Sequence, residues 1–132
     1  MTKENYLLDT HALIFWQNNI SISDDLVNFL DANEGLGRIF LSSISFWEIA
    51  LLVRKKKLDI IDIHGWRNEL LNNSTIVIIE PTMFEMVEST TLPDHHKDPF
   101  DRLLIVQANQ RDLVLISQDR QIQKYEVKCF WI

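Results

Sequence analysis

Five short apolar segments, separated by stretches in which apolar residues recur at helical spacing, constrain the fold of this chain most strongly. The segments lie at residues 6–8, 39–41, 75–79, 113–117 and 127–130. Apart from Thr75, Ser117 and Lys128, they are apolar at consecutive positions, which is typical of strands buried on both faces. The intervening stretches favour helices, and alternating strands and helices favour parallel pairing. The sequence therefore predicts an α/β protein with a parallel sheet covered on both sides.

Length and composition fit a single domain over residues 1–132. The longest apolar run is far shorter than the roughly 18 residues of a membrane-spanning helix. The first residues are too polar for a signal peptide, which predicts a cytoplasmic protein without a membrane partner. The net charge of −6 argues against a protein that coats nucleic acid electrostatically. A local basic run at residues 54–57 is either an RNA-facing patch or a solvated helix end.

The stretch from His95 to Ile105 contains the clearest local signals. Asp98 is a favoured N-cap residue and Pro99 suits the first helical position, so a helix is predicted to begin there. Asp101 then lies in the first turn of this helix. The strand predicted at residues 113–117 ends just before Asp119. In an open parallel sheet, helix N-termini and strand C-termini share one edge, so we expect Asp101 and Asp119 to meet there.

Two further acids are predicted at the same edge. Asp9 follows the first strand, and Glu48 lies near the first turn of a helix expected at residues 46–53. Each acid alone has an ordinary explanation as a cap, a turn residue or a helix-start charge, and Glu48 could close a capping box with Ser45. The conjunction of four acids is harder to explain in this way.

Electrostatics indicates what four such acids require. Two unit charges about 5 Å apart repel by about 3 kcal/mol even at an effective dielectric constant near 20. Either protonation or a divalent cation must neutralise the cluster. Carboxylate oxygens suit Mg²⁺ or Mn²⁺, and such an ion supports phosphodiester hydrolysis.

Four motifs in this order resemble the PIN-domain family, and in particular the VapC-type toxins of type II toxin–antitoxin systems. They are Leu7–Leu13, Ile44–Ala50, Leu92–Ile105 and Ser117–Asp119. The resemblance covers nearly the whole chain. It implies a three-layer α/β/α sandwich with a mainly parallel sheet of about five strands, and a metal-dependent endoribonuclease with Mg²⁺ or Mn²⁺ as cofactor.

The resemblance also implies roles for individual residues. The catalytic and metal-binding acids would be Asp9, Glu48, Asp101 and Asp119. Supporting residues that hold or cap these acids are predicted to be Asp98, Thr10, Ser45 and Ser117.

Substrate and partner contacts are predicted with alternatives left open. Arg102, Lys55 and His96 are candidate RNA contacts, although His95 and His96 fit ordinary loop residues better and Arg102 fits an ion pair equally well. The resemblance implies a homodimer and a VapB-like antitoxin, bound in an apolar groove that would use Ile14, Phe15 and Trp16. An antitoxin arginine would switch the acid cluster off. Apart from such a groove, an aromatic set is expected to lie mostly in the core, namely Phe15, Trp16, Phe46, Trp47 and Trp66.

Three competing interpretations remain. A haloacid-dehalogenase-like phosphatase also places an Asp after its first strand, but it needs a second Asp two positions later, where this chain has His11. A receiver-type module needs an acceptor Asp after a central strand and a Lys after a late one, and neither is suitably placed. A catalytically silent PIN scaffold would not need all four acids.

Overall fold

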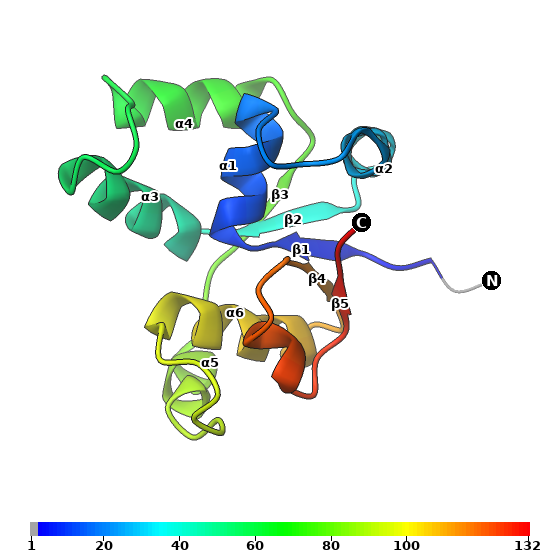
Figure 1. The fold of residues 1–132 in the computed structure, drawn as a ribbon, viewed down its shortest axis with the longest axis vertical. Helices are drawn as coiled ribbons and strands as arrows, with labels where there is room; N and C mark the ends of the chain where they lie inside the picture. Colours follow the sequence, from blue (N-terminus) through cyan, green and yellow to red (C-terminus); the bar gives the residue numbers. More distant parts are fainter. Residues whose placement is uncertain (1–2) are drawn as a thin grey trace.

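The computed structural model describes residues 3–132 and contains a five-stranded sheet between two layers of helices (Figure 1). All four neighbouring strand pairs are parallel, in the order β3-β2-β1-β4-β5. This confirms the predicted three-layer α/β fold. The strands are β1 (Tyr6–Leu8), β2 (Ile39–Ser42), β3 (Val77–Ile79), β4 (Val114–Ile116) and β5 (Cys129–Phe130).

The helices divide between the two faces of the sheet (Figure 1). One face carries α1 (Thr10–Asn18), α2 (Asp24–Gly35), α3 (Ile44–Arg54) and α4 (Ile63–Asn72). The other face carries α5 (Met83–Ser89), α6 (Pro99–Gln110) and a short 3₁₀ helix, η1 (Ile122–Lys124). None of these helices in residues 3–132 is long and apolar enough to cross a membrane.

Two hydrophobic clusters fill the space between the sheet and its helices. Consecutive strand residues point to opposite faces, so Leu7 packs in the cluster under α6 while Leu8 packs in the cluster under α1 and α2. Leu115 and Ile116 of β4 divide in the same way. Burial on both sides explains why these strands are apolar at every position.

Local capping signals place the helix starts where the sequence predicts them. The Asp98 carboxylate accepts hydrogen bonds from the backbone N–H groups of Phe100 (2.8 Å) and Asp101 (3.3 Å), with Pro99 as the first residue of α6. Thr82 and Glu85 form a reciprocal capping box at the start of α5.

Helix α3 begins earlier than predicted, and this changes the position of Glu48. Ser43 is the N-cap residue and makes no side-chain capping bond. Because α3 starts at Ile44, Glu48 lies in the second turn and Ser45 lies inside the helix. The alternative in which Ser45 and Glu48 form a capping box is therefore wrong.

The strands predicted at residues 75–79, 113–117 and 127–130 are each shorter in the structure. At the first of these, Thr75 lies outside β3, and its hydroxyl donates to the Glu34 carboxylate at 2.6 Å.

Candidate metal and active site

The candidate site lies at the carboxyl ends of β1 and β4. The strand order reverses between these two strands, because β2 and β3 lie on one side of β1, and β4 and β5 lie on the other. Open parallel sheets form their ligand crevice at such a switch point. Asp9 follows β1 directly, and its backbone N–H donates to the Ile116 carbonyl oxygen of β4 at 3.1 Å. Asp119 lies in the loop between β4 and η1. The topology therefore brings these two acids to neighbouring strand ends.

Helices α3 and α6 add the other two acids to the same place. Glu48 projects from the second turn of α3 and Asp101 from the first turn of α6. The negative charges of Asp9, Glu48 and Asp119 all act on the Asp101 carboxylate, together with that of Asp98. The four acids predicted from the sequence therefore lie close enough for the charges of the other three to act on Asp101, and we call these four residues the acid cluster.

Three members of the acid cluster are almost completely removed from solvent. Asp9, Glu48 and Asp101 are only 6%, 7% and 9% exposed. Burial, partly offset by the Ser117 hydroxyl and the Ala12 N–H, raises the pKa of Asp9 to about 6. Burial and the surrounding carboxylates raise the pKa of Asp101 to about 8. Near neutral pH the protein itself therefore does not fully neutralise this cluster.

Hydroxyl groups surround the acids on the side of β1 and α3. Asp9 caps α1, accepting from the Ala12 N–H at 2.7 Å. The Thr10 hydroxyl donates to the Ser45 hydroxyl at 2.9 Å, which joins the first turns of α1 and α3. Burial raises the pKa of Glu48, and the Thr10 hydroxyl offsets part of that rise. Three of the predicted supporting residues, Thr10, Ser45 and Ser117, are therefore buried beside the acids.

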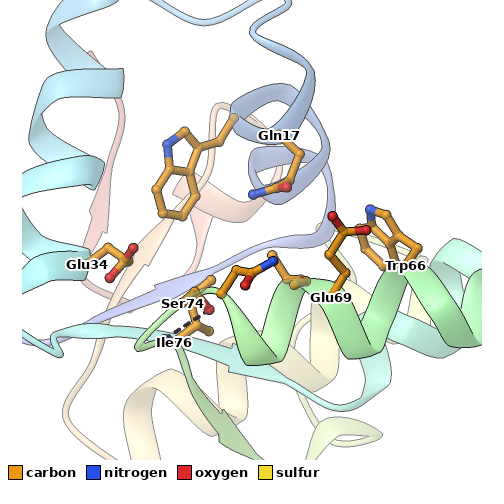
Figure 2. A pocket seen from close by; sticks show the side chains of 9 residues that line it. Gln17, Glu34, Trp66, Glu69, Ser74 and Ile76 are labelled. Atoms are coloured by element: carbon orange, nitrogen blue, oxygen red, sulfur yellow. Dashed lines mark hydrogen bonds between the residues drawn. The ribbon is translucent and has the colours of Figure 1, made fainter.

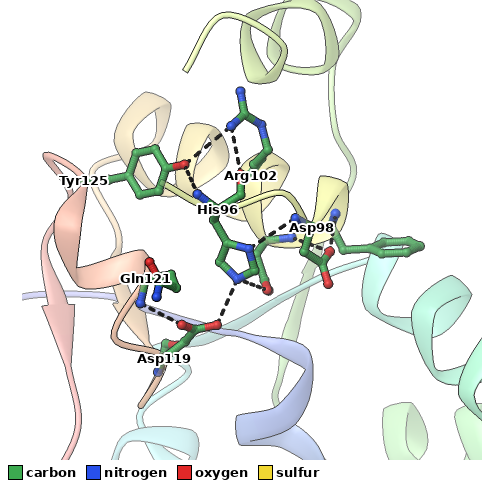
Figure 3. A network of polar contacts seen from close by, with 9 residues as sticks. His96, Asp98, Arg102, Asp119, Gln121 and Tyr125 are labelled. Atoms are coloured by element: carbon green, nitrogen blue, oxygen red, sulfur yellow. Dashed lines mark hydrogen bonds and ion pairs between the residues drawn. The ribbon is translucent and has the colours of Figure 1, made fainter. Parts of the chain in front are cut away.

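His96 lies between two of the acids, which sequence analysis did not foresee. Its Nε2 atom is 3.0 Å from Asp101 Oδ2 and 2.9 Å from Asp119 Oδ2 (Figure 3). Burial would raise the pKa of Asp119, but hydrogen bonds from the Gln121 N–H and from His96 outweigh it and leave this pKa lowered. His96 is 23 residues from Asp119 in the sequence. No local pattern signals such a contact.

The donor set fits a hard divalent cation. Glu48 Oε1 is buried and has no hydrogen-bond partner among residues 3–132. A buried carboxylate oxygen without a partner is costly unless a cation or a proton approaches it. Oxygen ligands from Asp9, Glu48, Asp101 and Asp119 match Mg²⁺ or Mn²⁺ better than Zn²⁺, which prefers nitrogen and sulfur.

The other residues predicted to contact RNA lie in different surroundings. The Arg102 side chain binds the segment before α6. Its guanidinium donates to the carbonyl oxygens of Ser89, Leu92, Pro93 and His96. Lys55 follows the last residue of α3, so it is at the opposite end of that helix from the acid cluster.

The aromatic residues divide between the core and the surface. Phe46 and Trp66 pack together at 6.0 Å in the partly buried layer over α3 and α4, as expected. Trp47 is 63% exposed and contacts Phe100 edge-on at 5.0 Å, so the expectation that it belongs to the core is wrong. It is the residue before Glu48 on α3, and the turn that buries the acid points the indole outward.

A cavity of about 350 Å³ lies on the α1 and α4 side of the molecule (Figure 2). Trp16, Trp66 and Leu70 give it an apolar wall, and Glu34 and Glu69 give it an acidic rim. Ile14 lines a neighbouring cavity, whereas Phe15 packs against Trp131. The groove predicted from Ile14, Phe15 and Trp16 thus exists in part, without Phe15 in either cavity wall.

Comparison with known proteins identifies the family. The model of the PIN domain matches residues 6–128, so the chain belongs to the PIN-domain family. PIN domains in general are metal-dependent nucleases, and this membership removes the phosphatase and receiver interpretations. The search of curated proteins gives no significant match.

Two solved structures share the fold. A toxin–antitoxin complex from Klebsiella pneumoniae has a chain with 16% identity and a TM-score of 0.63, and the match covers 96% of both chains. PAE2754 from Pyrobaculum aerophilum has 16% identity and a TM-score of 0.61, covering 96% of this chain and 83% of that one.

Proposed function

We propose that this chain is a metal-dependent endoribonuclease and the toxin of a toxin–antitoxin pair. The observation that carries the proposal is the acid cluster, in which Asp9, Glu48, Asp101 and Asp119 converge at the switch point of a PIN fold. A silent scaffold would have no reason to bury three carboxylates whose repulsion destabilises it. Binding a cation repays that cost.

The four acids would have different roles at the metal site, because their surroundings differ. Mg²⁺ or Mn²⁺ at the cluster would lower the pKa of a water molecule and neutralise charge on the scissile phosphate. Asp9 and Asp101 are held by the starts of α1 and α6, so they are rigid ligands. Glu48 supplies the buried oxygen that lacks a protein partner. Asp119, with a side chain 35% exposed, stands at the solvent side where substrate enters.

Cleavage of RNA is the direct test of the proposal. We would incubate total cellular RNA with the wild-type protein and with Asp101→Asn, in Mn²⁺ and in chelator, and map new 5′ ends. The proposal expects discrete ends that need both the metal and Asp101. Asp25→Asn, which changes an exposed acid at the start of α2, serves as the matched control and should cleave like the wild type.

Two outcomes would contradict the proposal. Equal cleavage by the wild type and by Asp101→Asn would indicate contamination or a wrong assignment of the acids. Metal binding without any new 5′ ends would favour the silent PIN scaffold.

The antitoxin would bind beside the cavity lined by Trp16, Trp66 and Leu70. Its apolar wall suits an apolar helix, and the acidic rim of Glu34 and Glu69 suits basic residues of that helix. The structural neighbour from Klebsiella pneumoniae is a toxin–antitoxin complex, which supports this partner. An antitoxin arginine that enters the acid cluster would compete with the metal, so a saturated complex that keeps full ribonuclease activity would contradict the inhibition.

The homodimer implied by the family resemblance is part of the same proposal. Light scattering on the isolated chain would measure its mass directly. A monomer at the concentration used for the cleavage assay would contradict the dimer without affecting the proposed ribonuclease.

A further inference from the structure

His96, which the sequence offers as a loop residue or an RNA contact, has a side chain held on several sides beside the acid cluster. Its ring nitrogens contact three groups: the Asp98 N–H at 3.1 Å, Asp101 Oδ2 at 3.0 Å and Asp119 Oδ2 at 2.9 Å. Its side chain is only 16% exposed. A ring held at both nitrogens is positioned by the fold, whereas a ring that awaits RNA would face solvent.

The contact with Asp98 settles which ring nitrogen carries the proton. The backbone N–H of Asp98 donates to Nδ1, so the lone pair of Nδ1 is engaged and no proton can be bound there. The single proton of the neutral ring is therefore on Nε2, which faces the two carboxylates. His96 is consequently a hydrogen-bond donor to Asp101 and Asp119, and its Nε2 lone pair is not available to a metal ion.

The backbone of His96 is held as firmly as its ring (Figure 3). Its N–H donates to the Tyr125 hydroxyl oxygen at 2.8 Å, and its carbonyl oxygen accepts from Arg102 at 3.0 Å. The Tyr125 hydroxyl donates in turn to the Pro93 carbonyl oxygen at 2.6 Å. Residues from α6 and from the segment after η1 thus fix the loop that carries the imidazole.

Asp119 and Asp101 both use His96 as a partner of one carboxylate oxygen. The Asp119 Oδ1 atom accepts from the Gln121 N–H at 2.8 Å, but within residues 3–132 the only hydrogen bond to Oδ2 comes from His96. Asp119 is also the most exposed of the four acids. Without the imidazole, its carboxylate would be free to rotate toward solvent and away from Asp101.

We infer that His96 is a positioning residue of the acid site, whose imidazole Nε2–H holds Asp101 and Asp119 together so that both can ligate one divalent cation. The inference rests on the proposed function, since it assigns a role within the same metal site. It replaces the prediction that His96 contacts RNA. Groups that orient metal ligands in this way typically change metal affinity 10- to 100-fold when they are removed.

Mn²⁺ affinity measured by calorimetry on the full chain, without RNA, tests the inference. We expect His96→Ala to weaken Mn²⁺ binding by about 10- to 100-fold. His96→Gln should restore most of the affinity, because its amide N–H reaches the Nε2 position, and His96→Asn should not, because its amide reaches only the Nδ1 position. His95→Ala is the matched control, since His95 packs edge-on against Tyr125 at 5.1 Å and makes no hydrogen bond to the acids. It should bind Mn²⁺ like the wild type.

The electron spin echo spectrum of bound Mn²⁺ separates positioning from direct ligation. An imidazole nitrogen that ligates Mn²⁺ couples to its electron spin. If His96 only positions the acids, the wild-type protein and His96→Gln should give the same spectrum, without a nitrogen coupling from His96. The three atoms His96 Nε2, Asp101 Oδ and Asp119 Oδ lie within 4.8 Å of one another, which is the spacing that direct ligation would need. Detection of the coupling would overturn the positioning role.

The outcomes also separate this inference from the proposed function. Unchanged Mn²⁺ affinity in a folded His96→Ala protein, with RNA cleavage by the wild type intact, overturns the role of His96 alone. Weaker binding in His96→Ala with rescue by His96→Gln, in a protein that cleaves no RNA, supports the role of His96 and contradicts the ribonuclease. A wild-type protein that binds no Mn²⁺ overturns both.

Discussion

Gln107 lies in the middle of α6 and is completely buried, yet neither atom of its side-chain amide has a hydrogen-bond partner among residues 3–132. Burying such a group costs about 1 to 3 kcal/mol. Met has nearly the same length and shape without the polar atoms. We therefore expect Gln107→Met to increase the free energy of unfolding by about 1 kcal/mol.

Urea unfolding of the two proteins in chelator would measure this gain. Gln17→Met is the control, because Gln17 is exposed near the end of α1 and the change there should have little effect. A loss of stability in Gln107→Met would show instead that the amide has a partner, such as a buried water molecule, that stabilises it.

The residues of the site differ in how well the sequence predicts them. Asp98 and Pro99 are predictable because a cap acts on N–H groups two and three residues away. Asp9 and Asp119 are predictable because each follows an apolar strand in a parallel sheet. His96 is not, since its contacts depend on how the loop before α6 folds against the loop after β4.

At the scale of elements, a buried ion pair joins α5 to the end of α6. Arg111, the residue after α6, donates to Glu85 at 3.0 and 3.2 Å and to the Glu80 carbonyl oxygen at 2.6 Å. Glu85 is only 2% exposed. Burial raises its pKa, but the hydrogen bonds from Arg111 and Thr82 outweigh this and leave the pKa lowered. The carboxylate therefore stays charged and depends on Arg111.

Removing only the arginine should destabilise the protein strongly. We expect Arg111→Ala to lower the free energy of unfolding by about 3 kcal/mol, because Glu85 is then left buried without its cation. The double variant Arg111→Ala with Glu85→Gln should recover part of that loss. Thermal unfolding measures the stability of both variants. A double variant no more stable than Arg111→Ala would show that two hydrogen bonds, from Arg111 to the Glu80 carbonyl oxygen and between Glu85 and Thr82, matter more than the buried charge of Glu85.

The start of α3 differs from the start that the sequence predicts. The serine-rich stretch from Ser42 to Ser45 predicts a helix that starts at Phe46, whereas α3 begins at Ile44. The Ser45 hydroxyl makes a tertiary contact with Thr10, and the N-cap residue Ser43 makes no side-chain capping bond. Trp47 was assigned to the core because it is large and apolar. The buried residues of α3 are Ile44, Ser45, Glu48 and Ile49, and Trp47 lies outside this stripe.

For the whole molecule, the sheet was predictable as a parallel sheet, but its strand order was not. Apolar runs indicate how deeply a strand is buried and say nothing of which strand is its neighbour. The central place of β1, between β2 and β4, is what brings Asp9 beside Asp119. The acid cluster could thus be predicted as a set of residues, while its geometry follows from the order of the strands.

The acid cluster also sets how the stability of the whole metal-free protein depends on pH. In the unfolded chain these carboxyl groups titrate near pH 4. In the folded protein the pKa of Asp9 is raised to about 6 and that of Asp101 to about 8, in both cases chiefly by burial. The folded state therefore binds more protons than the unfolded state between about pH 4 and pH 8, so stability falls as the pH rises through this window.

Urea unfolding in chelator between pH 5 and pH 9 should show this loss as a decrease of about 2 to 5 kcal/mol in the free energy of unfolding. Asp101→Asn removes the group with the most strongly raised pKa, so it should flatten most of the slope and be more stable than the wild type at pH 8. Asp25→Asn should keep the wild-type slope. Saturating Mn²⁺ should reverse the trend in the wild type, because the cation binds the ionised carboxylates of the folded state alone. A metal-free wild type whose stability is constant or rises up to pH 8 would mean that the cluster is not strained by its own charge, and that the argument for a bound cation loses its physical basis.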